Sequence, residues 1–197
     1  NIMAELVERI AAQKPQIIGF DMVFAEPDRT SLKLAAARIA TLTGAPVTLP
    51  PGSEDNDARF AEAIGKADTV LGYYFDMLPD APGAGAAAVP GAPGDERRPC
   101  PEFCLPVAAV ETLVRRSELP LAAKAVLNLP CLNDAALSEG FFNNLPDVDG
   151  VTRRGSLLVR YGDMLYPSLA LEMVREGLGT EPRLVSNTPG VGVTGLV

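Results

Sequence analysis

Two short apolar runs, each set between helical patterns, constrain the fold of this chain most. IIGFDMVF (residues 17–24) lies between prolines, and TVLGYYF (residues 69–75) follows an amphipathic pattern. A continuous apolar run rich in β-branched and aromatic residues is typical of a strand that is buried on both faces. Helical patterns that alternate with such strands indicate α/β layering. We therefore expect the two runs to form central, neighbouring strands of one sheet.

The first helical pattern, residues 2–13, has an apolar face that includes Met3, Leu6, Val7 and Ile10. Further patterns predict an Ala-rich helix, a helix that begins at Ser53, a weakly defined helix, a strand and a short helix. Apart from the helix at Ser53, these elements are expected, in the same order, at residues 31–42, 103–114, 124–129 and 134–139.

The late part of the chain predicts a β-hairpin followed by a helix. DVDG (residues 147–150) is a turn, because Asp side chains bond their own backbone and Gly adopts positive φ. Residues 151–161 alternate as a strand, and residues 162–163 make a second turn. Ser168 suits a helix cap, and Gly179 suits the end of that helix. The expected fold is mixed α/β, with a largely parallel central sheet flanked by helices.

The length of 197 residues fits a single domain with a real core. Residues 80–99 are mostly Pro, Gly and Ala, so they bury too little apolar surface to offset their ordering entropy. We expect one domain, residues 1–197, with a mobile insertion at residues 80–99. Asn1 opens directly on a helical pattern and the chain stops within an apolar phrase. Both ends are therefore expected to be cuts in a longer protein.

The formal net charge of -8 argues against nucleic acid as a partner and against docking flat on an anionic membrane. No apolar run reaches the roughly 20 residues that a transmembrane helix needs. Cys100, Cys104 and Cys131 leave two alternatives open, one disulfide with one remaining thiol or three thiols. A zinc site is disfavoured, because C-x-x-x-C is not the usual spacing and the chain has no His.

Carboxylates gather just past the first predicted strand. Asp21, Glu26 and Asp28 follow it, with Arg29 beside them. Ligands of open α/β sheets bind beyond the carboxyl ends of strands, and three carboxylates can hold a hard cation or a cationic ligand. The alternative is a solvated acidic turn in which Asp28 caps the next helix. That alternative is favoured, because acidic turns of this kind are common.

A second polar group lies in the late hairpin, where Asp147 and Asp149 precede Arg153 and Arg154. A carboxylate pair can serve acid–base catalysis, but a turn whose acids pair with neighbouring Arg side chains is favoured. If a small molecule or ion binds this domain, we expect the following residues to line its site: Asp21, Glu26, Asp28, Arg29, Asp149 and Arg153.

The remaining motifs point away from catalysis. GVGVTG (residues 190–195) matches G-x-G-x-x-G without the strand, helix and acid that a dinucleotide site needs, so we interpret it as a Gly-rich loop. The chain has no His and no usefully placed Ser, Cys or Thr nucleophile. We predict no catalytic residue, no metal and no cofactor.

Three stretches resemble the signatures of one family. They are LPDVDGVTRR with YPSLALE after the next strand, IGFDMVFAEPDR (residues 18–29) and PGSEDNDARFAEA (residues 51–63). Together, and in this order along the chain, they resemble the second class of CHASE domains, the extracytoplasmic sensory domains of bacterial membrane receptors. The family pattern also has a strand before the first helix and another after Val197, which this sequence lacks.

The resemblance implies a sensory input domain without chemistry or cofactor of its own. It implies a parent that is anchored in the inner membrane, with this domain in the periplasm and an output module inside. In the family that output is a nucleotide cyclase, a histidine kinase, a Ser/Thr kinase or a diguanylate cyclase. The signal would be an unknown small molecule or ion, and the full receptor is a possible homodimer.

Two other classes compete with a sensor. One is an α/β hydrolase or transferase that uses Asp21, Glu26 and Asp28 around a divalent metal, and a metal bound there would favour it. The other is a ligand-free dimerisation module, which a dry two-fold interface would favour. The helix predicted at residues 2–13 is the candidate interface, although packing against its own sheet is favoured.

Overall fold

The computed structural model describes residues 2–50, 53, 55–77, 99, 103–110, 119–143, 149–153, 155–185 and 195–196. The helices are α1 (Ile2–Ala11), α2 (Leu32–Thr43), α3 (Asn56–Ile64), the 3-10 helix η1 (Val107–Val110), α5 (Pro130–Asn133) and α6 (Leu169–Leu178). The strands are β1 (Ile18–Phe20), β2 (Thr69–Met77), β3 (Leu105–Pro106), β4 (Leu121–Val126), β5 (Ser138–Phe141), β6 (Leu158–Tyr161), β7 (Met164–Pro167), β8 (Leu184–Val185) and β9 (Gly195–Leu196).

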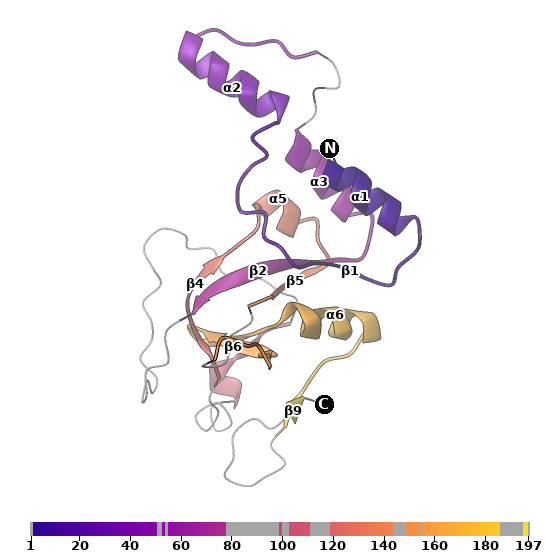
Figure 1. Ribbon diagram of the computed structural model, residues 1–197, viewed down its shortest axis with the longest axis vertical. Helices are drawn as coiled ribbons and strands as arrows, with labels where there is room; N and C mark the ends of the chain where they lie inside the picture. The colour runs from indigo at the N-terminus through magenta and orange to yellow at the C-terminus, as the bar shows by residue number, and fades with distance from the viewer. Residues whose placement is uncertain are drawn as a thin grey trace.

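A mixed seven-stranded sheet organises the domain, which confirms the predicted mixed α/β class (Figure 1). The strand order is β1-β2-β4-β6-β7-β3, and β5 also pairs with β2. Parallel pairing joins β1 to β2, β2 to β5 and β4 to β6, whereas β2–β4, β6–β7 and β3–β7 are antiparallel. A late hairpin followed by a helix is present as β6, β7 and α6, but its turn lies at residues 162–163 and not at the predicted residues 147–150.

Strand β2 is the centre of the sheet. Its first half pairs with β1 and β5, and its second half pairs with β4. The predicted neighbourhood of the first two strands is confirmed. The expectation that both are central is wrong for β1, which ends the strand order. The chain leaves the sheet after Phe20, and the Phe24 ring packs edge-to-face against Phe20 and Phe60.

Two asparagine side chains complete the hydrogen bonding of β2 where its neighbours end. Asn128 donates to the Gly72 carbonyl at 2.9 Å and accepts the Phe24 N–H at 2.8 Å. Asn143 both accepts from and donates to the Phe75 backbone, each at 2.7 Å. Buried backbone groups are costly when unpaired, so these amides stabilise the strand where no neighbouring backbone reaches it.

Helices α1, α3 and α5 cover one face of β1 and β2 (Figure 1). Their shared core includes the fully buried Val7, Ile64 and Leu71. The first helix therefore packs against its own domain, as favoured from the sequence. Leu6, on the same predicted face, is 43% exposed.

Helix α6 covers the opposite face of the sheet (Figure 1). It lies close to glycines of the strands beneath it. A Cβ at Gly140 would lie 2.6 Å from the Leu169 Cα, and a Cβ at Gly19 would lie 2.3 Å from the Met173 Sδ. Only glycine allows the helix so close to these strands. Ser168 accepts the Leu171 N–H at 3.2 Å as the predicted cap.

Several predicted boundaries are wrong. The hairpin turns at residues 162–163, so residues 164–167 form β7 before the helix begins. The short helix is α5, and part of the range expected to be helical, Ser138 and Glu139, forms β5 instead. Residues 80–98 of the expected insertion lie outside the described residues, as do residues 190–194 of the Gly-rich motif.

Candidate functional site

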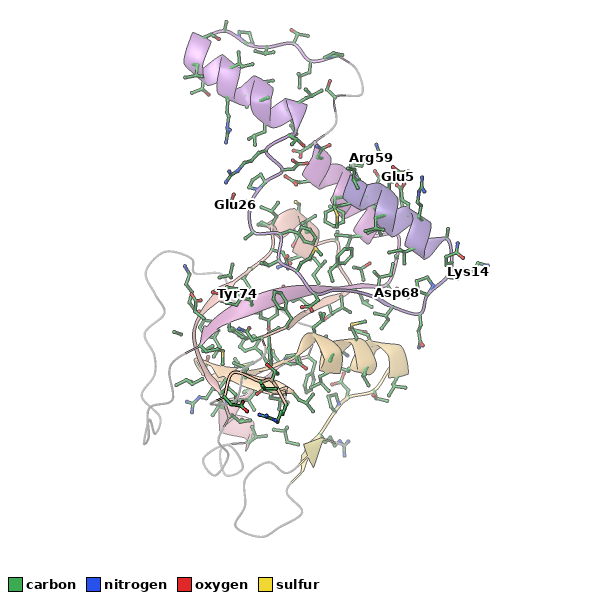
Figure 2. All side chains as sticks on the ribbon, in the orientation of Figure 1. Glu5, Lys14, Glu26, Arg59, Asp68 and Tyr74 are labelled. Carbon is green, nitrogen blue, oxygen red and sulfur yellow. The ribbon has the colours of Figure 1, made fainter. Side chains whose placement is uncertain are left out.

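The predicted acidic segment is a loop, residues 21–31, that leaves β1 and leads to α2. It runs on the side of the sheet that carries α1, α3 and α5, and Figure 2 labels Glu26 on it. Asp21 is exposed at the start of this loop. Glu26 and Arg29 form an ion pair whose two side chains are 70% and 73% exposed. Four predicted site residues therefore share one loop.

Asp28 folds the end of this loop. Its Oδ1 accepts the Thr30 N–H at 2.8 Å and the Thr30 hydroxyl at 2.7 Å, while its Oδ2 accepts the Asn56 amide at 2.8 Å. The hydrogen bonds from Thr30, more than that from Asn56, hold the pKa of Asp28 below its ordinary value. Asp28 bonds Thr30 within a turn and does not cap α2, whose N-cap residue is Ser31.

The same loop is joined to the start of α3. The Asp28 N–H donates to both carboxylate oxygens of Asp57, at 3.1 and 3.2 Å. Burial raises the pKa of Asp57, and the nearby charges of Asp55 and Asp28 add to that rise, whereas the bond from Asp28 opposes it. Asp55 caps α3 by accepting the Asp57 N–H at 3.1 Å, and Lys33 lies 3.6 Å from Asp55.

The other end of the loop is fixed by Phe24. Its N–H donates to Asn128, and its carbonyl accepts the Leu129 N–H at 2.8 Å. Asn128 in turn bonds the Gly72 carbonyl in β2. The loop is therefore fastened to the sheet at Phe24 and to α3 at Asp28, with Glu26 between the two anchors.

Asp149 and Arg153 form a separate group. Arg153 donates to both carboxylate oxygens of Asp149, at 2.9 and 2.7 Å, and this pairing lowers the pKa of Asp149. The segment that leads into β6 lies below β2 in Figure 1, away from the loop of residues 21–31. The favoured pairing of turn acids with Arg side chains is thus observed for this pair. Asp147 and Arg154 lie outside the described residues.

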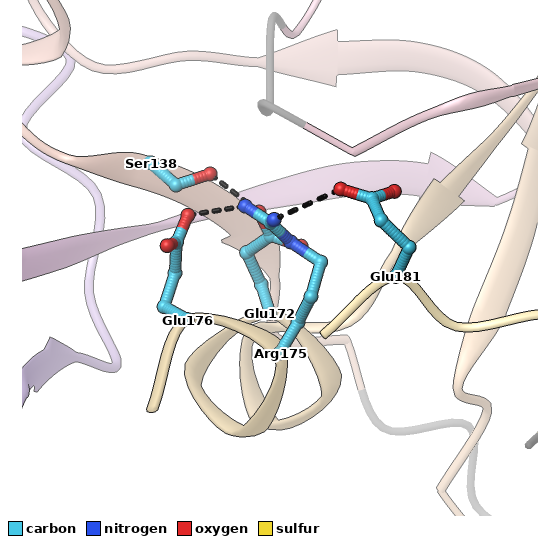
Figure 3. Close-up of polar contacts among 5 residues, drawn as sticks. All are labelled: Ser138, Glu172, Arg175, Glu176 and Glu181. Carbon is cyan, nitrogen blue, oxygen red and sulfur yellow. Dashed lines mark hydrogen bonds and ion pairs between the residues drawn. The ribbon is translucent and has the colours of Figure 1, made fainter. Parts of the chain in front are cut away.

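A buried charge network beneath α6 was not predicted from the sequence (Figure 3). Glu172 is fully buried and accepts from the Ser138 hydroxyl at 2.6 Å and from Arg175 at 2.9 Å. Arg175 also pairs with Glu176 and lies 3.7 Å from Glu181. The only sequence signal was the E-x-x-R spacing, which also suits an exposed helix face.

Within the described ranges, no group of three or more His, Cys, Asp or Glu side chains is arranged to hold a metal ion. None of the described helices has the length and apolar character needed to cross a bilayer. What the fold defines at this point is an α/β domain with an exposed charged loop anchored to its core.

Comparison with known families makes the assignment specific. The model of the CHASE2 domain family matches residues 1–193, so this chain belongs to the CHASE2 domain family. CHASE2 domains are extracellular sensory domains of membrane receptors, which confirms the resemblance noted in the three sequence stretches. Neither the curated proteins nor the solved structures gave a significant match.

Proposed function

We propose that this domain is the non-catalytic sensory input of a bacterial transmembrane signalling receptor and lies on the periplasmic side of the inner membrane. The observation that carries the proposal is the CHASE2 match, which covers residues 1–193. The output module would be a nucleotide cyclase, a histidine kinase, a Ser/Thr kinase or a diguanylate cyclase inside the cell. A homodimeric receptor would turn a change in this domain into a change in that output.

The ligand contact in this proposal is the loop of residues 21–31. Asp21, Glu26 and Arg29 are exposed there, so a small ion or polar molecule can reach them. Asp28 accepts hydrogen bonds from Thr30 and Asn56 and thereby stabilises the loop. The Asp149–Arg153 pair is an alternative contact.

The two anchors supply a route for the signal. A ligand that moved the loop would change two sets of hydrogen bonds. One joins Asp28 to Asp57 in α3, and the other joins Phe24 through Asn128 to β2. Coupling between distant sites needs such a physically connected element whose equilibrium the ligand can bias. This supports the loop as the sensing element.

Calorimetry with divalent metals and small organic cations tests this assignment. The wild type is compared with Glu26→Gln and Asp21→Asn, which each remove a carboxylate from the loop, and Asp149→Asn serves as the matched control on the other exposed pair. Loss of a charge-assisted contact should weaken binding roughly tenfold in either loop variant and leave the control unchanged. Equal binding by all proteins, or weakening in Asp149→Asn alone, would remove the loop from the site.

A further inference from the structure

A cavity of about 300 Å³ lies at the surface beside the first residues of β1 and β2. Its lining consists of Ala11 at the end of α1, Pro15 in the loop that follows, Ile18 at the start of β1, and residues 65–68 between α3 and β2. Figure 2 labels Asp68 here, on the side of the molecule away from Glu26. The volume is at the lower end of the range for small-molecule sites, roughly 300–1,000 Å³. The loop of residues 21–31 leaves the opposite end of β1, so the cavity is a separate place on the fold.

Two helix C-termini meet at this cavity. Helix α1 ends at Ala11, and α3 ends at Ile64, next to the lining residue Gly65. The last carbonyl groups of a helix lack partners within it, and the helix dipole is negative at this end, so each C-terminus attracts a cation. Lys14 turns the chain from α1 into Pro15 and has a positive φ of 56°, which is uncommon for a residue other than glycine.

The two charged side chains of the lining differ in their partners. Lys66 is paired with Glu62 at 2.7 Å. Asp68 is exposed and forms no ion pair with any residue that the structure describes. Around Lys66, Glu8 and Arg59 add one charge of each sign. The free carboxylate and the two helix ends therefore give the cavity an excess of negative charge.

We propose that this cavity binds the primary ammonium group of a small organic molecule. A primary ammonium carries three N–H donors. Asp68 supplies a charged acceptor for one of them, and the last turns of α1 and α3 supply backbone carbonyl acceptors. This inference does not rest on ligand binding by the loop of residues 21–31.

Other ions fit the cavity less well. Quaternary ammonium ligands have no N–H and are recognised by aromatic side chains, whereas none of the described lining residues is aromatic. Ca²⁺ and Mg²⁺ take about six oxygen ligands, and Asp68 is the only carboxylate among the described lining residues. An anion would have to draw Lys66 away from Glu62, and Asp68 and both helix C-termini would repel it.

Amide chemical shifts of the isotopically labelled chain, titrated with butylammonium chloride, locate and measure this binding. A ligand of this size binds weakly, so we expect a dissociation constant of about 1 mM. The largest shifts should fall on Ile18 and residues 65–68. Asp68→Asn should raise the dissociation constant roughly tenfold, and tetramethylammonium, which has no N–H, should bind roughly tenfold more weakly than butylammonium. Asp76→Asn is the matched control, since it makes the same change at an exposed acid near the far end of β2 and should leave binding unchanged.

Four results would overturn the proposal. The first is a wild type whose cavity amides do not shift with butylammonium, and the second is equal weakening by Asp68→Asn and Asp76→Asn. The third is a set of shifts at the cavity with sodium acetate that Lys66→Gln abolishes, which would assign the cavity to anions. The fourth is butylammonium shifts confined to residues 21–31. That last outcome would exclude the cavity and support the loop named in the proposed function, so the two sites are tested separately.

Discussion

Asp28 shows how one side chain shapes the loop of residues 21–31. It accepts from Thr30 and Asn56, and its own N–H donates to Asp57. The sequence predicted an acidic turn here but could not specify Asn56 as a partner, because that contact spans 28 residues. Glu172 was harder to predict, since its burial depends on Ser138 in a strand that its sequence did not indicate.

At the residue scale, Asp28→Ala removes the acceptor of three hydrogen bonds. We expect the free energy of unfolding to fall by about 1–2 kcal/mol at neutral pH, with the lower end favoured by the partial exposure of the site. The folded-state pKa of Asp28 is lowered, so its stabilisation is present above the unfolded-state pKa and is lost as pH falls through the folded-state value. Urea unfolding at several pH values should show the variant and the wild type converging in acid.

Asp149→Ala is the control for this measurement, since it removes an exposed acid whose pKa is also lowered. Its effect on stability should be smaller, because surface ion pairs contribute little. A difference between Asp28→Ala and wild type that did not change with pH would contradict the role assigned to the Asp28 carboxylate.

At the element scale, the position of α6 depends on backbone approach more than on its apolar pattern. Leu169 is buried, but Val174 and Leu178 are 56% and 68% exposed, while the charged Glu172 and Arg175 are buried. The predicted helix, its cap and its final glycine are confirmed. Which face it buries could not be predicted from hydrophobic periodicity, because Gly140 and Ser138 on β5 select the face.

Alanine substitutions at the two glycines beneath α6, Gly140 and Gly19, test this packing. Gly140→Ala places a Cβ against the Leu169 backbone, which cannot move alone, so we expect a loss of about 2–3 kcal/mol. Gly19→Ala meets only the flexible end of Met173, and a rotamer change should limit the loss to about 1 kcal/mol or less. Thermal and urea unfolding give both values, and equal losses would show that α6 is not held by close approach at Gly140.

At the scale of the whole molecule, the fold class followed from alternating helices and short apolar strands, but the strand order did not. The β5 sequence, SEGF, has weak strand propensity, yet it pairs with β2, and its Gly140 lies against the start of α6. Three separated stretches resembling CHASE signatures were more informative about function than any pattern of catalytic residues. The family match likewise extends along the chain, over residues 1–193, and does not depend on one motif.

The central claim is that this domain lies outside the cytoplasm, and labelling of Cys131 in the full receptor tests it most directly. Cys131 is exposed at α5, and burial of its sulfur region raises the thiol pKa, so labelling is best done with a membrane-impermeant maleimide at mildly alkaline pH. The test receptor keeps Cys131 as its single cysteine, because Cys104 is also a free thiol, and the control receptor additionally carries Cys131→Ser. The account predicts that spheroplasts containing the Cys131 receptor react before permeabilisation and that the control lacks this signal. Labelling of Cys131 only after the inner membrane is permeabilised would contradict it.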